Sequence, residues 1–144
     1  MNDVSHLVAE VLRAYANFVL RKDAAGFAAL YDVDVQLFDA WDSWRMHGRA
    51  AVQSMATAWF DSLGDRRVEV TFSEVQVRAD AELAAVSALV TYSALGTDGA
   101  RLQSQVNRMS LVLRRRPEGW GVVHEHTSVP VGFTSRQAVP WPMA

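Results

Sequence analysis

Apolar side chains recur at helical spacing near the start of the chain and at two-residue spacing through most of its second half. Residues 7–19 predict an amphipathic helix, because their apolar members fall three or four positions apart on one face. Asp23 has the short oxygen-bearing side chain of an N-cap and predicts a second, short helix over 23–31. A third helix is predicted from Arg49 to Leu63, where Gly64 supplies a C-terminal stop.

Two-residue alternation predicts the strands. The first is Val33–Asp39, and residues 40–48 after it predict a loop or a short hairpin. Four further strands, separated by turn signals, are predicted over residues 68–77, 82–95, 101–114 and 120–129. Three helices followed by an antiparallel meander indicate an α+β fold, in which the helices pack on one face of a curved sheet.

The last segment, residues 130–144, breaks the alternation. It contains three of the four prolines together with Trp141. Proline cannot donate to a strand ladder, so this segment is predicted to be a tail rather than another strand. The chain is therefore interpreted as one domain over residues 1–129 followed by a tail over 130–144, which could lie against a neighbouring surface.

Composition narrows the classes of partner and compartment. The 144 residues are enough for one sizeable core, and the formal net charge of -2 lacks the basic footprint of a nucleic-acid-binding protein. The absence of cysteine excludes disulfides, thiolate nucleophiles and cysteine-based zinc sites, and it fits a reducing compartment. No apolar stretch approaches the roughly 20 residues of a membrane span. The N-terminus has no signal-peptide pattern, so we expect a cytoplasmic protein with no membrane partner.

Two runs of sequence resemble a known superfamily. The run LRAYANFVLRKDAAGFAALYDVDVQLFDAWDSWRMHGRAAV is similar to the N-terminal half of ketosteroid isomerases. The run NRMSLVLRRRPEGWGVVHEHTS resembles the SnoaL-like branch and the association domain of calcium/calmodulin-dependent kinase. With the predicted order of elements, the resemblance to the NTF2-like superfamily covers roughly residues 5 to 129. It implies a cone in which a curved antiparallel sheet and three helices enclose a pocket, but it does not by itself define an activity.

The resemblance to ketosteroid isomerases implies roles for individual residues. Tyr15 falls at the position of the oxyanion-hole tyrosine and Asp39 at that of the general-base aspartate. Those isomerases also use a protonated aspartic acid in the oxyanion hole. Counting back from the turn at 117–119 places that position at Leu111, or at Ser110 or Met109 after a slip of one or two residues. None of these is a carboxylic acid, so the full isomerase mechanism is not expected.

The last predicted strand offers a second source of acid/base chemistry. By the two-residue period, His124, His126 and Ser128 share one face, and Glu125 lies on the other. The resemblance implies that the histidine face looks into the pocket. Asp39 could then orient one imidazole and make it a general base. This arrangement is similar to the Asp–His pair of scytalone dehydratase, a member of the same superfamily.

Each of these residues also has a purely structural interpretation. Tyr15 could be a core tyrosine, because it lies on the apolar face of the first helix. Asp39 could shape the turn that follows its strand. The histidine pair could form hydrogen bonds at a dimer face, where related association domains use this strand. Two histidines and an aspartate could in principle hold a metal, but their spacing is not distinctive, and no metal site is predicted.

The remaining candidates concern substrate binding. Trp41 and Trp44 could line an aromatic mouth of the pocket, and Asn107 could join Tyr15 in orienting a carbonyl or enolate oxygen. Leu111, Met109 and Ser128 are expected to line the same pocket. Arg108 either binds a ligand carboxylate or pairs with an acid on the neighbouring strand, such as Glu125.

Two functions remain open at this point. The first is a cofactor-free enzyme that isomerises, dehydrates or cyclises a small hydrophobic, cyclic carbonyl compound by acid/base chemistry. The second is a non-catalytic module of the same fold that binds a small ligand or assembles subunits. In both cases we expect a hydrophobic small-molecule ligand, a homodimer, no cofactor and no nucleic acid.

Overall fold

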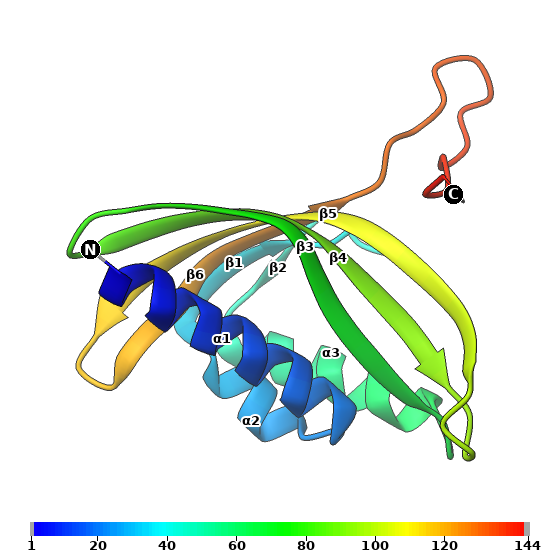
Figure 1. Cartoon of the computed structure of the whole chain (residues 1–144), viewed down its shortest axis with the longest axis horizontal. Helices are drawn as coiled ribbons and strands as arrows, with labels where there is room; N and C mark the ends of the chain where they lie inside the picture. The colour runs from blue at the N-terminus through cyan, green and yellow to red at the C-terminus, as the bar shows by residue number, and fades with distance from the viewer. Residues whose placement is uncertain (1, 143–144) are drawn as a thin grey trace.

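Three helices and six strands make up residues 2–142, which are the residues that the computed structural model describes (Figure 1). The helices are α1 (Asn2–Leu20), α2 (Ala24–Ala29) and α3 (Arg49–Ser62). The strands are β1 (Tyr31–Phe38), β2 (Met46–His47), β3 (Arg67–Ala79), β4 (Leu83–Leu95), β5 (Arg101–Arg116) and β6 (Gly119–Ser128). Every predicted element is present, and β2 is the short hairpin partner expected within residues 40–48. Residue 1 of the predicted domain and residues 143–144 of the predicted tail lie outside the described residues.

The six strands form one curved sheet in the order β2-β1-β6-β5-β4-β3. The meander from β3 to β6 is antiparallel throughout, as predicted. The first strand departs from this pattern, because β1 pairs with β6 in parallel. This pairing brings the end of β1 next to the end of β6. Residues that are nearly 90 positions apart in the chain are thereby placed side by side.

The helices cover the concave face of the sheet (Figure 1). Burial follows the predicted helical period on α1, since the buried positions fall three or four residues apart. The buried side chains of the three helices are Val8, Leu12, Tyr15, Val19, Phe27, Ala28, Val52, Ala56 and Phe60. They pack against the inward side chains of the strands in one contiguous hydrophobic core. The fold is therefore the α+β cone that the sequence predicts.

A β-bulge in β6 changes which side chains face the core. Leu113 of β5 pairs with Val122, but the preceding residue, Val112, pairs with His124. Val123 is therefore an extra residue with no partner of its own across the ladder. Because side chains alternate between the two faces of a strand, one extra residue exchanges the faces for every position that follows.

The exchange overturns the predicted orientation of the last strand. Glu125 and Thr127 face the core and are buried. His124 and His126 face outward, where His126 is exposed and His124 is half-buried. The prediction that the histidine face lines the interior is therefore wrong. Unbroken alternation is the assumption that fails, and the bulge is the physical reason.

An ion pair ties the start of β1 to the end of β5, with a buried carboxylate and a half-exposed Arg114 side chain. Asp32 is buried and accepts a hydrogen bond from Arg114. Arg116 lies 3.9 Å from the same carboxylate and also donates to the carbonyl oxygens of Tyr31, at 3.4 Å, and Ala29, at 3.3 Å. The largely buried Arg116 side chain therefore binds backbone carbonyls at the α2–β1 junction, where Arg49 Nε also donates to the Tyr31 carbonyl at 2.8 Å.

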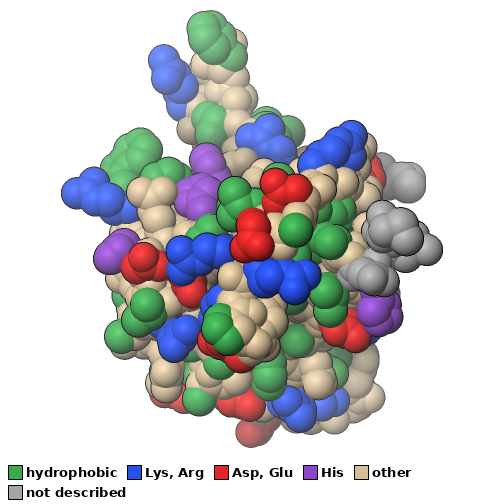
Figure 2. All heavy atoms as spheres, turned by 90° about the vertical axis from the view of Figure 1, so that its left-hand side faces the viewer, with side chains coloured by type: hydrophobic (Ala, Val, Ile, Leu, Met, Phe, Trp, Pro, Cys, Tyr) green, Lys and Arg blue, Asp and Glu red, His purple; other side chains and the backbone are tan. Residues whose placement is uncertain are grey.

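The chain leaves the sheet after Ser128 and forms a small hairpin closed by a bridge between Val131 and Ala138. In Figure 2 this hairpin stands off the rest of the molecule as an arm. Val131 and Phe133 are 60% and 92% exposed, so the arm carries apolar side chains that the chain itself does not cover. On the face below, acidic and basic side chains are interspersed (Figure 2).

Candidate active site

A buried acid and a tyrosine meet on the inner face of the sheet. Glu125 comes from β6 and Tyr31 from the start of β1, and the two strands are neighbours. The Tyr31 hydroxyl donates a hydrogen bond to Glu125 Oε1 at 2.5 Å. Glu125 is only 5% exposed and Tyr31 is fully buried. Because an ionised carboxylate is costly in such a place, the charge of Glu125 depends on its few polar neighbours.

The surroundings of Glu125 raise its pKa to about 7. Desolvation by burial is the main cause, and the negative charge of Asp39 acts in the same direction. The hydrogen bond from Tyr31 partly offsets both, since it stabilises the ionised form. Glu125 can therefore release or accept a proton near neutral pH, which is the property that a catalytic acid or base requires.

One oxygen of Glu125 remains available. Among the described side chains, only Arg116 Nε and Trp120 Nε1 are fully buried nitrogen or oxygen atoms without a hydrogen-bond partner. Oε2 of Glu125 is not in this group, although no described residue donates a hydrogen bond to it. Oε2 therefore keeps hydrogen-bonding capacity that no described side chain uses. A buried carboxyl with one free oxygen can exchange a proton with a ligand.

Two further tyrosine hydroxyls lie within the same interior. Tyr15 of α1 and Tyr92 of β4 share a hydrogen bond of 2.7 Å. Burial raises the pKa of both hydroxyls, and the charge of Glu125 raises them further. Both therefore remain protonated at neutral pH and can donate hydrogen bonds. Tyr15 is also an aromatic core residue, whose ring packs edge-on against Phe27 with a centroid separation of 4.9 Å.

Asp39 lies immediately after β1, at the boundary between the interior and the surface. Its Oδ1 accepts hydrogen bonds from the Thr127 hydroxyl at 2.8 Å and from the Ala40 backbone N–H at 2.9 Å. The charge of Asp39 raises the pKa values of Glu125, Tyr31 and Tyr92. This carboxylate is thus held in place by β6 and lies within electrostatic reach of the buried polar group.

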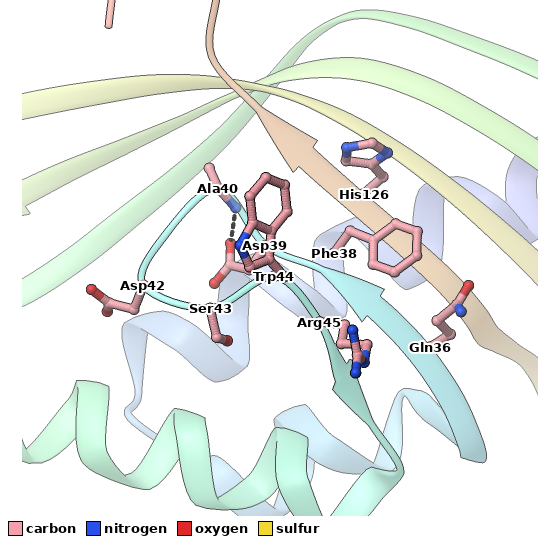
Figure 3. A pocket seen from close by; sticks show the side chains of 9 residues that line it. All are labelled: Gln36, Phe38, Asp39, Ala40, Asp42, Ser43, Trp44, Arg45 and His126. Carbon is pink, nitrogen blue, oxygen red and sulfur yellow. Dashed lines mark hydrogen bonds between the residues drawn. The ribbon is translucent and has the colours of Figure 1, made fainter. Parts of the chain in front are cut away.

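Asp39 also borders an open hollow of about 700 Å³ on the outer side of β1 (Figure 3). Phe38, Trp44 and His126 line the same hollow. Trp44 is 91% exposed and belongs to the loop that connects β1 with β2. Of the predicted site residues, the hollow brings together Asp39, Trp44 and His126. Trp41 is half exposed and does not line it.

The two histidines do not form the predicted unit with Asp39. His124 Nδ1 lies 3.0 Å from the backbone oxygen of Gln36, and the ring of Phe38 packs edge-on against both imidazoles. No hydrogen bond joins either imidazole to Asp39 within residues 2–142. In Figure 3 the carboxylate of Asp39 instead turns toward the backbone nitrogen of Ala40. The histidines therefore belong to the outer surface of the sheet.

The inner face of β5 completes the wall around the buried acid. Asn107, Met109 and Leu111 all point inward and are buried. Asn107 Oδ1 accepts a hydrogen bond from Gln105 Nε2 at 3.0 Å. Leu111 is paired across the sheet with Glu125. Counting along the sequence places Leu111 at the position of the second oxyanion-hole acid. The structure places the carboxyl group of Glu125, from the neighbouring strand β6, beside that position.

Sequence reasoning misses Glu125 and Tyr31 as site residues. Strict alternation places Glu125 on the outer face, and the helical pattern places Tyr31 at the end of a helix. One signal is present in the sequence, since the neighbours Val122 and Val123 are both apolar and interrupt the alternation of the strand. Two adjacent apolar residues within an alternating strand can indicate a bulge.

Arg108 and Ser128 lie on the outer face of the sheet. The guanidinium Nε of Arg108 donates to Ser128 Oγ at 3.0 Å. The predicted alternative, a pair between Arg108 and Glu125, is wrong, because the sheet separates an exposed Arg108 from a buried Glu125. These two predicted binding residues are therefore apart from the buried acid.

The described part of the chain has neither a cluster of metal-binding side chains nor a membrane-spanning helix. Between residues 4 and 142, no three histidine, cysteine, aspartate or glutamate side chains gather closely enough to hold a metal ion. No helix of the described chain combines the length and the apolar character needed to cross a membrane.

Comparison with known families agrees with this geometry. The profile of the SnoaL-like domain matches residues 8–132, which is most of the chain. The chain belongs to the SnoaL-like domain family. The match confirms the resemblance to the NTF2-like superfamily, and it ends inside the segment that the sequence predicts to be a tail. No curated protein matches this SnoaL-like domain.

Solved structures share the fold of this SnoaL-like domain at low sequence identity. An NTF2-like protein of unknown function from Pseudomonas putida KT2440 is 21% identical, with a TM-score of 0.81 and coverage of 100% of this chain and 99% of that one. An NTF2-like protein from Streptomyces avermitilis, provisionally described as a dehydratase, is 16% identical, with a TM-score of 0.76 and coverage of 92% and 100%. A protein from Xanthomonas campestris, provisionally described as a calcium/calmodulin-dependent protein kinase II association domain, is 16% identical, with a TM-score of 0.71 and coverage of 84% of each chain.

Proposed function

We propose that this SnoaL-like domain is a cofactor-free enzyme that performs acid/base chemistry on a small hydrophobic, cyclic carbonyl compound. The observation that carries the proposal is the buried carboxyl of Glu125, whose pKa is about 7, beside the second carboxylate of Asp39. Two carboxyl groups in such different environments favour a division of labour between an acid and a base. The buried residues Met109 and Leu111 of the neighbouring strand are apolar, which suits a hydrophobic substrate.

The division of roles follows from exposure and hydrogen bonding. Asp39 is only partly buried and serves as the base that removes a proton from the carbon next to the carbonyl group. Glu125, protonated below pH 7, donates through its free Oε2 to the substrate oxygen. The hydroxyls of Tyr15 and Tyr92 stabilise the developing negative charge on that oxygen. Return of the proton at another carbon gives isomerisation, and departure of a protonated hydroxyl group gives dehydration.

The remaining inward residues form the binding wall. Met109 and Leu111 supply apolar surface, and Asn107 supplies a side chain that can orient the substrate. The proposal assigns no proton transfer to His124 or His126, because both lie outside this interior. The likeness to a protein provisionally described as a dehydratase supports elimination of water as one of the two reactions.

Proton exchange on a panel of model compounds tests the proposal, so the natural substrate need not be identified first. Cyclic ketones and β-hydroxy ketones are incubated with the full chain in D2O, and deuterium incorporation and water loss are followed by NMR. The wild type should catalyse exchange or elimination with at least one member of the panel. Asp39→Asn and Glu125→Gln should each lose about 100-fold or more in rate, which is the usual contribution of a general acid or base.

His124→Ala is the matched control, because His124 is a titratable residue of the same strand that faces outward. Its rate should stay within a few-fold of the wild type. The proposal fails if the wild type is inactive across the panel. It also fails if Asp39→Asn and Glu125→Gln retain full activity while remaining folded by circular dichroism.

A non-catalytic binding or assembly module is the second candidate function. The outer face of the sheet favours it, since Phe38, His124 and His126 form an aromatic cluster there and Trp44 projects from the adjacent loop. An exposed cluster of this kind suits a contact between two copies of the chain. Analytical ultracentrifugation should then show a homodimer that Phe38→Ser weakens. A monomer at all concentrations would remove the assembly form of this candidate. The cytoplasmic location stays a prediction, supported by the absence of cysteine.

A further inference from the structure

A second hollow lies on the outer side of the sheet, between strands β4 to β6 and the tail residues that flank the arm, Pro130 and 139–142. Its volume is about 260 Å³. Leu89, Arg108 and Ser128 form its floor, and Pro140 and Trp141 of the returning tail form its roof. The floor residues are neighbours in the sheet, because Arg108 pairs with Leu89 on one side and with Ser128 on the other.

Among the described residues that line this hollow, Arg108 is the one with a charged side chain. Ser128 Oγ accepts a hydrogen bond from Arg108 Nε at 3.0 Å, which fixes the direction of the guanidinium group. No acidic side chain pairs with Arg108 within residues 4–142, whereas Arg101, Arg114 and Arg116 each have an acidic partner. The terminal nitrogens of Arg108 therefore have donors that no described side chain uses. A planar guanidinium group with free donors matches the geometry of a carboxylate.

The roof has a defined conformation. The Val139 N–H donates to the Pro130 carbonyl at 2.8 Å, and the Gly132 N–H donates to the Gln137 carbonyl at the same distance. These bonds turn the tail back toward the sheet. Trp141 thereby lines the same hollow as Arg108, although the two residues are more than 30 positions apart in the chain.

We propose that this hollow binds a small aromatic carboxylate. The carboxylate pairs with Arg108, and the ring lies between the apolar side chain of Leu89 and the indole of Trp141. A single guanidinium group suits one negative charge, and the volume is slightly below the range of about 300–1,000 Å³ occupied by drug-sized ligands. A ligand the size of benzoate meets both conditions.

This site is separate from the acid/base site proposed above. Arg108 faces outward, whereas Met109 and Leu111 of the same strand are buried in the core, and Asn107 also borders the hollow. The sheet therefore lies between Arg108 and Glu125. A substitution at one site should leave the other intact, so failure of one proposal can be distinguished from failure of the other.

The test is a titration of the full chain with benzoate and with its uncharged analogue benzamide, followed by ¹H–¹⁵N NMR. Benzoate should shift the Trp141 indole signal and the backbone signals around Arg108 and Ser128 in a saturable manner. Benzamide and the variant Arg108→Gln should each bind about 10- to 100-fold more weakly, the range expected for loss of hydrogen bonds to a charged group. Trp141→Ala should weaken benzoate binding while retaining its preference over benzamide.

Two matched controls separate this site from a general charge effect and from the buried acid. Arg78→Gln removes one positive charge from an exposed position on β3, and Glu125→Gln alters the interior. Both variants should bind benzoate as the wild type does. The proposal is overturned if Arg108→Gln binds benzoate with unchanged affinity, or if the shifts centre on residues around Glu125. It is also overturned if benzoate gives no saturable shift at concentrations up to about 10 mM, because a dissociation constant above that value corresponds to very weak binding.

Discussion

Glu125→Gln should change the pH dependence of the protein's stability. The carboxyl of Glu125 has a pKa of about 7 in the native structure, compared with 4.5 in an exposed glutamate. Between these two pH values the native state holds a proton that the unfolded chain has already released. Native stability from this group is therefore fully present below pH 4.5 and is lost as the pH rises to 7. A glutamine side chain does not titrate in this pH range, and its carbonyl oxygen can still accept a hydrogen bond from the Tyr31 hydroxyl.

The size of the effect follows from the same two pKa values. One pH unit between them corresponds to about 1.4 kcal/mol, so ionisation of Glu125 should cost about 3 kcal/mol of native stability by pH 8. This is a large fraction of the 5–15 kcal/mol that stabilises a typical domain. The difference in unfolding free energy between the wild type and Glu125→Gln should therefore fall by about 3 kcal/mol between pH 4.5 and pH 8.

Urea unfolding followed by tryptophan fluorescence measures this difference across the pH range. Glu82→Gln is the matched control, because Glu82 is an exposed glutamate at the turn before β4. Tyr31→Phe removes the hydrogen bond that lowers the pKa of Glu125, so it should move the titration to still higher pH. A difference between wild type and Glu125→Gln that stays constant from pH 4.5 to 8 would refute the reasoning. It would also remove the main support for Glu125 as a catalytic acid.

Three substitutions away from the site test the packing that positions it. Gly121→Ala should lower the unfolding free energy by about 1–3 kcal/mol, because the new Cβ would lie 2.4 Å from Nε of the anchored Arg116; a thermal melt equal to the wild type would show that Arg116 moves freely. Asp32→Asn should cost about 1.5–3 kcal/mol by weakening the part-buried hydrogen bond with Arg114, and urea unfolding in 1 M NaCl should show a smaller loss, because salt screens the half-exposed Arg114 side chain. Phe27→Ala should cost about 3–5 kcal/mol, since this fully buried ring contacts core residues from several elements; a loss below 1 kcal/mol in urea would mean that the core closes around the gap.

The elements of the fold could be predicted because each has a local cause. The apolar stripe of α1, the N-cap at Asp23 and the alternation of the long strands all appear in short windows of sequence. Asp23 does accept the predicted type of bond, from the Gly26 backbone N–H at 2.9 Å. The parallel pairing of β1 with β6 has no such local signal. It results from the way the helices direct the chain back to the far edge of the meander.

The buried acid could not be predicted from alternation, because orientation in a strand accumulates from one residue to the next. A single extra residue at Val123 reverses every later position in β6. The reversal moves Glu125 inward and the two histidines outward. The positions of Asp39 after β1 and of Tyr15 on α1 could be predicted because they precede the bulge and depend on other elements; their roles in a site stay predictions. The protonation of Glu125 also depends on tertiary structure, since burial by distant segments is what raises its pKa.

The sequence by itself determined the class of fold, the order of the elements, the membership of the superfamily and the presence of acid/base side chains. These properties depend on local periodicity, capping residues and composition, which a linear chain already contains. Only the tertiary structure decided which acid is buried, which face of β6 meets the core, and that Trp141 returns to lie over Arg108. These properties depend on contacts between residues far apart in sequence, and such contacts exist only once the backbone register of the whole sheet is set.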